Sequence, residues 1–179
     1  MNKNEIQAAV VDMLSSGMGK TEVFAKLSGQ GIKDSRLAYM VASYADPARC
    51  DEHDRKVNIL ITIMFIQAVI AFLMGFAIGG KIGPNAKWVV SGLIAAIPLL
   101  FAWGFYRHKV GAYNIYIVLT IIQFPRSLDG FASNPVINGI ALAINLAVLA
   151  YVMYVRQKLF PDFIFISPKK VKGQYIFSS

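Results

Sequence analysis

A run of twenty-three residues without a charged side chain, residues 57–79, limits what this chain can fold into more than any other feature. An α-helix rises about 1.5 Å per residue, so a helix of this length covers the roughly 30 Å hydrocarbon core of a bilayer. Thirteen of these residues are Leu, Ile, Val or Phe, and together they favour membrane insertion by about 5 kcal/mol. The run therefore predicts a membrane-spanning helix.

Three more apolar runs follow this segment, at residues 88–106, 110–128 and 136–155. They make the 179-residue chain 56% hydrophobic, with a mean hydropathy of +0.51. A soluble domain of this size has no core large enough to bury so much apolar surface. We therefore expect an all-α integral membrane protein built on a four-helix transmembrane bundle.

The third of these runs leaves two alternatives open. Its apolar part, residues 110–124, reaches only roughly 22 Å as a helix. It either crosses the membrane by continuing past Pro125, with Arg126 extending toward the headgroups, or it re-enters on the same side. Crossing would give the N-terminal region, the 107–109 turn and the C-terminal tail a common side with fifteen Lys and Arg, against three opposite. This positive-inside pattern predicts four spans, with both termini in the cytosol of a bacterial cell.

Uncharged polar side chains recur at intervals inside the apolar runs. In a membrane such groups face protein, where amides and hydroxyls hydrogen-bond between helices. A packing role is the ordinary interpretation, and a polar pathway through the bundle is the alternative. Ion-coupled transport usually requires a charged side chain at mid-depth. The apolar runs carry none there. The candidate polar stripe consists of Gln67, Tyr113, Thr120, Gln123, Asn138 and Asn145.

Two glycines at the end of the first run, Gly75 and Gly79, have GxxxG spacing. Glycine has no side chain, so this spacing lets a second helix approach closely. We expect both positions to serve helix packing.

Residues 1–47 have the pattern of three short amphipathic helices, with Asn4 as the expected N-cap of the first and Gln7 three residues later. They predict a small cytosolic head, joined to the first span by a charged linker at residues 48–56. The spacing also fits a helix-turn-helix. Its third helix offers DNA only Lys33, Ser35 and Arg36 before it becomes apolar, so protein contact is favoured over nucleic acid.

The C-terminal tail, residues 156–179, is basic and aromatic. Apolar residues alternate with others at 163–167 and 174–178, and PKKVKG lies between these stretches. This pattern predicts a single β-hairpin. Its aromatic side chains need cover, either from the membrane surface or from the head.

Several cations lie where a span is expected to meet water, and anionic headgroups attract cations by about 1 kcal/mol each at such positions. We expect contacts with lipid headgroups at Arg55, Lys56, Arg107, Lys109, Lys169, Lys170 and Lys172.

No nucleophile–base pair, phosphate-binding loop, dinucleotide motif or zinc-protease motif is recognisable in the chain. Cys50 and His53 have metal-ligand spacing, but a metal site needs three or four ligands. We therefore expect no catalysis, cofactor or metal. The leading hypothesis is an inner-membrane protein that binds a protein partner through its head and tail, as an immunity-type protein or a membrane-complex subunit, with homo-oligomerisation compatible. The alternatives are a small channel or transporter subunit and a membrane-tethered helix-turn-helix regulator.

Overall fold

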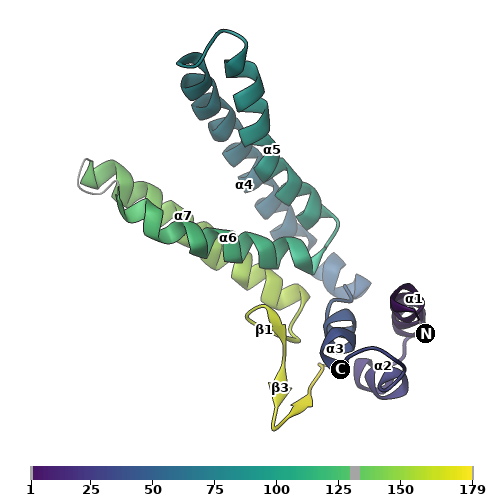
Figure 1. The fold of residues 1–179 in the computed structure, drawn as a ribbon. Coiled ribbons are helices and arrows are strands. Elements are labelled where there is room, and N and C mark those ends of the chain that lie inside the picture. The colour runs from purple at the N-terminus through teal and green to yellow at the C-terminus, as the bar shows by residue number, and fades with distance from the viewer. Residues whose placement is uncertain (1, 130–133, 179) are drawn as a thin grey trace. The chain divides into compact units, whose positions relative to one another are not determined.

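The protein is represented by a computed structural model that describes residues 2–129 and 134–178, with the side chains of 127–129 left out. The described part is 75% helical, with seven helices and a small β-structured tail. Two compact units make up the chain. The terminal unit comprises Met1–Cys50 and Arg156–Ser179, and the central unit comprises Asp51–Val155. The expectation of a mainly helical protein is confirmed (Figure 1).

The terminal unit contains three short helices, α1 (Lys3–Ser15), α2 (Lys20–Leu27) and α3 (Asp34–Ala42). Each places its apolar residues on one face at helical spacing, and these faces pack against each other. The residues so buried are Ile6, Val10, Leu14, Val23, Leu27, Leu37, Ala38, Val41 and Ala42.

The first helix begins earlier than the sequence indicates. Its N-cap is Asn2 rather than Asn4, and the Asn2 backbone N–H donates to Glu5 Oε2 at 2.8 Å. A carboxylate three residues after the cap is the stronger acceptor and suits the positive end of the helix dipole. The prediction of Asn4 with Gln7 was therefore wrong by half a turn.

The tail forms two consecutive hairpins rather than the single one expected. Strands β1 (Phe163–Ile164) and β2 (Ser167–Pro168) make the first, and β3 (Lys170–Val171) and β4 (Gln174–Tyr175) make the second. Lys172 and Gly173 form the second turn with φ of 49° and 86°, the conformation of a two-residue hairpin turn that matches the twist of its strands. The PKKVKG segment therefore supplies a strand and a turn of its own.

The tail is fixed to the head by Asp162, which is only 1% exposed. Its carboxylate pairs with Lys20 Nζ of α2 at 2.7 Å and accepts the Ser178 backbone N–H at 2.5 Å. Its carbonyl oxygen accepts the Lys169 N–H at 2.7 Å. One residue thus joins α2, the second hairpin and the end of the chain.

Three aromatic side chains of the tail are covered by the head. The ring centre of Phe24 in α2 lies 5.5 Å from each of the Tyr175 and Phe177 ring centres. Tyr39 in α3 meets Phe163 edge-on at 5.4 Å. The head is therefore the cover of these three rings, whereas Phe165 is 47% exposed.

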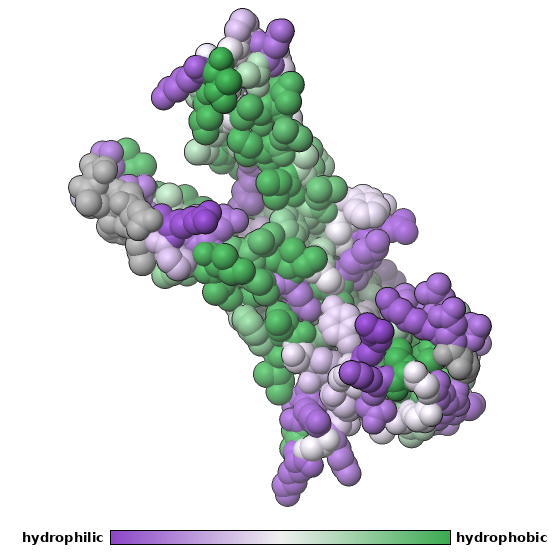
Figure 2. Space-filling view, in the orientation of Figure 1, coloured by the Kyte–Doolittle hydropathy of each residue, from purple (hydrophilic) through white to green (hydrophobic). Residues whose placement is uncertain are grey.

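The central unit is made from two long helical hairpins, α4 (Pro47–Gly80) with α5 (Ala86–Tyr106), and α6 (Val110–Asp129) with α7 (Pro135–Leu159) (Figure 1). Among the described residues, α4, α5 and α7 are long and apolar enough to cross a membrane. Apolar side chains cover much of the two helical hairpins in Figure 2, whereas hydrophilic residues gather on the head. This pattern is consistent with a membrane protein.

The charged segment expected as a linker, residues 48–56, is part of α4. Asp46 caps the helix by accepting the Ala48 N–H at 3.0 Å, and Pro47 occupies the first turn, where its missing N–H costs nothing. Residues 48–74 contain no glycine or proline. The helix therefore runs from the head into the first apolar run without a break.

Helices α4 and α5 pack closely at the two glycines singled out in the sequence. A Cβ atom at Gly75 would lie 2.7 Å from Ser91 Cα, and one at Gly79 would lie 2.5 Å from Lys87 Cα. Helix α5 meets α6 through Phe105 and Tyr113, whose ring centres are 4.5 Å apart. Helix α5 therefore packs against α4 through backbone contacts and against α6 through aromatic rings.

Replacing Gly79 with Ala should push α5 away from α4, because the new methyl group would meet backbone that cannot rotate aside. We expect a loss of about 1–3 kcal/mol, typical of overpacking, measured as a lower midpoint in thermal unfolding of the purified protein in detergent. Gly80→Ala is the matched control, since no atom lies within 4 Å of its Cβ position. Equal midpoints for the two variants would contradict this packing.

Replacing Asp162 with Asn should release the tail, because it leaves the nearly buried Lys20 ammonium without its counter-charge. Breaking such a pair costs about 3 kcal/mol, so trypsin should cut at the tail lysines on the order of 100-fold faster. The measurement is limited proteolysis of the full chain in detergent. Asp12→Asn, an exposed position on α1, should change the rate by less than about threefold. Similar rates for both variants would show that the ion pair does not hold the tail.

Candidate functional sites

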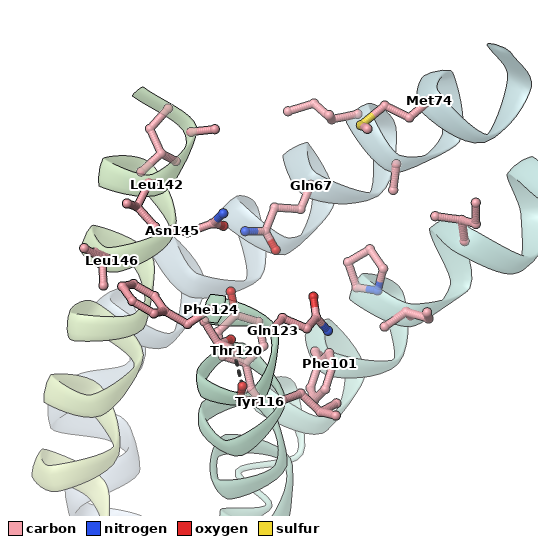
Figure 3. Close-up of a pocket in the computed structure, with 18 residues that line it drawn as sticks. Gln67, Met74, Phe101, Tyr116, Thr120, Gln123, Phe124, Leu142, Asn145 and Leu146 are labelled. Atoms are coloured by element: carbon pink, nitrogen blue, oxygen red, sulfur yellow. Dashed lines mark hydrogen bonds between the residues drawn. The ribbon is translucent and has the colours of Figure 1, made fainter. Parts of the chain in front are cut away.

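The larger candidate site is a cavity of 630 Å³ in the central unit, lined by residues from α4, α5, α6 and α7 (Figure 3). Most of the lining is aliphatic or aromatic. Five side chains add uncharged hydrogen-bonding groups, and no lining residue is charged. The polar set is Gln67, Tyr116, Thr120, Gln123 and Asn145.

The polar groups come from three helices and face one another across the cavity. Gln67 of α4 and Asn145 of α7 point toward each other (Figure 3). Thr120 Oγ1 donates to the Tyr116 carbonyl oxygen at 2.8 Å. The result is a band of amide and hydroxyl groups between apolar walls.

Four of the six residues of the predicted polar stripe line this cavity, namely Gln67, Thr120, Gln123 and Asn145. Two others lie elsewhere. Tyr113 is fully buried against Phe105 in the contact between α6 and α5, and Asn138 lies near the start of α7, outside the lining.

Tyr116 lines the cavity but did not enter the predicted stripe. It lies four residues before Thr120 and seven before Gln123, which places all three on one face of α6. Tyr113 lies on nearly the same face, seven residues before Thr120, but about 10 Å closer to the start of α6, where it packs against Phe105. Helical spacing alone could have identified Tyr116.

The cavity is open at its apolar edge. Ile70, Met74, Ile97 and Ile144 line it and are each more than half exposed. In a bilayer such side chains meet acyl chains. The site could accept a molecule with an apolar body and an uncharged polar group, which would reach the amide band.

The second candidate site is a groove of 350 Å³ on the head, lined by residues of α1 and α3 and by the two that follow α3. It combines two cations, Lys3 and Arg36, with two tyrosines, Tyr39 and Tyr44, and with apolar groups that include the half-exposed Val11. None of the lining residues is acidic. We call this the α1–α3 groove.

The tail braces one wall of the α1–α3 groove. Tyr39 packs edge-on against Phe163, and the guanidinium carbon of Arg156 lies 5.6 Å from the centre of the same ring. Arg156 is 2% exposed. The ring of Phe163 is thus held between a helix of the head and the end of α7.

The cations expected at lipid headgroups lie on the surface or over aromatic rings. Arg55, Arg107 and the tail lysines are exposed. Lys56 Nζ lies 5.5 Å from the Tyr154 ring centre and Lys109 Nζ 4.6 Å from that of Trp103. Aromatic and basic residues of this kind are typical of a membrane–water interface.

Cys50 and His53 lie in the first turns of α4 without a third ligand. Within the described residues, no group of three or more His, Cys, Asp or Glu side chains is positioned to hold a metal ion. His53 is buried, and its Nδ1 lies 3.8 Å from Glu52.

No family model matches the chain, and it matches no curated protein and no solved structure. Its function has to be inferred from the two sites. The cavity offers hydrogen bonds in an apolar setting, and the groove offers positive charge and aromatic surface to water.

Proposed function

We propose that this is a non-catalytic, four-span protein of a bacterial inner membrane whose cytosolic head and tail bind an acidic segment of a protein partner. The observation that carries the proposal is the α1–α3 groove, in which two cations and two tyrosines meet without any acid. Because Phe163 and Arg156 support Tyr39 from behind, residues from both the N-terminal and the C-terminal part of the chain form this surface.

The composition of the terminal unit supports four crossings. Its two parts, one from each end of the chain, share a nearly buried ion pair between Lys20 and Asp162. They must then lie on the same side of any membrane that the intervening helices cross. An even number of crossings is needed, and α4, α5 and α7 supply three.

Helix α6 is the natural fourth span. It has twenty residues and so reaches about 30 Å, the thickness of the hydrocarbon core. It continues through Pro125, as spans can when neighbouring helices satisfy the freed backbone group. Tyr116, Thr120 and Gln123 line the cavity. Tyr113 packs against Phe105 of α5, and Arg126 lies close enough to the end of α6 to reach the headgroups.

The chemistry of the α1–α3 groove fits an acidic protein segment. Arginine and tyrosine are enriched among the residues that dominate binding energy in protein interfaces. The terminal unit holds eleven Lys and Arg against six Asp and Glu, so its field attracts an acidic partner from a distance. An immunity-type protein or a subunit of a membrane complex would use such a surface.

Protein is favoured over DNA because the tail already occupies part of the third helix. Strand β2 lies against α3, and Tyr39 contacts Phe163. A recognition helix has to present a free face to the major groove. Helix α3 therefore suits a short peptide or helix better than a duplex.

The cavity supports a second candidate function, a small channel or transporter subunit. Its band of amides from α4, α6 and α7 could pass an uncharged polar solute or hold the polar end of an amphiphile. The two functions differ in their sensitivity to Asn145. Asn145→Leu would abolish flux in liposomes under the second function and leave partner binding unchanged under the first.

The proposed topology predicts how single cysteines react in a Cys50→Ser background. Asn2→Cys and Gln174→Cys, one in each part of the terminal unit, should react with a membrane-impermeant maleimide only after the cells are permeabilised. Asn85→Cys, between α4 and α5, should react in intact cells. Labelling of Asn2→Cys and Gln174→Cys on opposite sides would contradict four crossings.

The proposed partner site predicts a specific cross-link. A photo-reactive amino acid replacing Val11, which is 49% exposed in the groove, should form one adduct with a protein in living cells. The same amino acid at Thr21, exposed on α2, should not. The adduct is identified by mass spectrometry, and the acidity of the cross-linked segment is itself part of the prediction.

Charge reversal distinguishes the groove from general attraction to a basic surface. Lys3→Glu with Arg36→Glu should weaken binding of the identified partner by roughly tenfold or more. Lys26→Glu with Lys33→Glu changes the net charge equally but alters no groove residue. Equal losses in the two double variants would refute the groove as the binding site.

A further inference from the structure

The turn of the first tail hairpin presents three bulky apolar side chains in a row to solvent. Ile164, Phe165 and Ile166 are 57%, 47% and 39% exposed. Exposed turns normally carry polar residues, and a contiguous apolar patch marks an interaction surface. We call residues 164–166 the tail tip.

The backbone of the tail tip shows that an aromatic side chain is kept there at a conformational cost. Phe165 has φ of +55°, a region that bulky L-residues rarely occupy. At the equivalent position of the second hairpin the residue is Lys172, with φ of +49°, whose charged side chain water solvates. Glycine would relax the first turn without exposing a ring, so we take the ring of Phe165 to have a use other than making the turn.

The tail tip stands on a rigid base. Phe163, one residue before it, is 5% exposed and held between Tyr39 and Arg156. Asp162 is fixed by Lys20 and by the backbone of Ser178. The apolar side chains therefore project from a braced hairpin and cannot fold back into the core of the terminal unit.

The composition of the tail favours a lipid surface as the partner of the tail tip. Residues 163–178 include three lysines, all exposed, and no acid. Lys169 follows the tip by three residues, and Lys170 and Lys172 belong to the second hairpin. An exposed apolar turn on a basic segment is the pattern of groups that bind anionic lipid. Helix α7 ends at Leu159, so the tip lies within roughly 21 Å of the end of a membrane-crossing helix along the chain.

We propose that the tail tip inserts into the anionic cytosolic leaflet, with Lys169, Lys170 and Lys172 on the headgroups. The tip would then be a membrane contact additional to the spans. Since the same hairpin braces Tyr39, insertion would hold the α1–α3 groove at the membrane surface.

Tryptophan fluorescence of the full chain in nanodiscs tests this insertion. In a background with Trp88→Phe and Trp103→Phe, the Phe165→Trp variant should show blue-shifted emission in nanodiscs that contain phosphatidylglycerol. Acyl chains brominated near the glycerol should quench roughly half of this emission, as expected for a ring about 5–10 Å below the surface. The control Ala8→Trp, exposed on α1, should be neither shifted nor quenched.

Quenching should fall when Lys169, Lys170 and Lys172 are all changed to Gln, and when phosphatidylcholine replaces the anionic lipid. Emission of Phe165→Trp that matches Ala8→Trp in every nanodisc would overturn the proposal. Shielding that appears only on addition of a soluble protein would overturn it as well.

A second variant keeps the test decisive if tryptophan disturbs the turn. Phe165→Gly retains the backbone conformation and removes only the ring. In anionic nanodiscs, trypsin should cut the wild-type tail several-fold more slowly than that of Phe165→Gly, while in detergent the two should be cut alike. Equal protection in anionic nanodiscs would show that the ring does not enter the membrane.

Discussion

The ion pair between Lys20 and Asp162 joins the two ends of this chain, and much else depends on it. Asp162 is almost wholly withdrawn from water, where an unpaired carboxylate would be strongly unfavourable. Its second oxygen and its carbonyl group bind the backbone of the tail. This arrangement orders both hairpins, and through Phe163 it shapes one wall of the α1–α3 groove. A small head of three helices buries little surface by itself, and the tail supplies the rest.

The same junction constrains what lies between the two ends. If the apolar helices cross a membrane, the chain must return to the side from which it started, because both of its ends belong to one compact unit. Three helices are apolar enough to cross, so the proposed topology takes α6 as the fourth span. Three polar side chains of α6 line the cavity, and they lower its hydropathy relative to the other three helices.

The sequence predicted the helical character and the apolar runs well, because helix periodicity and hydropathy are local properties. It also predicted most of the polar set in the cavity, since Gln67, Thr120, Gln123 and Asn145 are the polar exceptions within apolar runs. It did not separate Tyr113 from Tyr116, because both share the polar face of α6 and their height along the helix decides which one lines the cavity. The division of the tail into two hairpins was missed for a different reason. Alternation suggests strands but does not mark where the turns fall, and Phe165 and Lys172 have positive φ although neither residue type favours it. The role of Asp162 was invisible too, because its partner Lys20 is 142 residues away.

The two tail turns illustrate how one backbone demand receives two answers. Both hairpins place a residue other than glycine in the left-handed region, Phe165 in the first and Lys172 in the second. The lysine carries a charge that water solvates, whereas the phenylalanine stands between two isoleucines and all three are exposed. Glycine at position 165 would relax the turn and remove an exposed apolar group. Under the proposed insertion of the tail tip, a bilayer supplies the apolar phase that this ring lacks in water, which would offset the cost of the conformation.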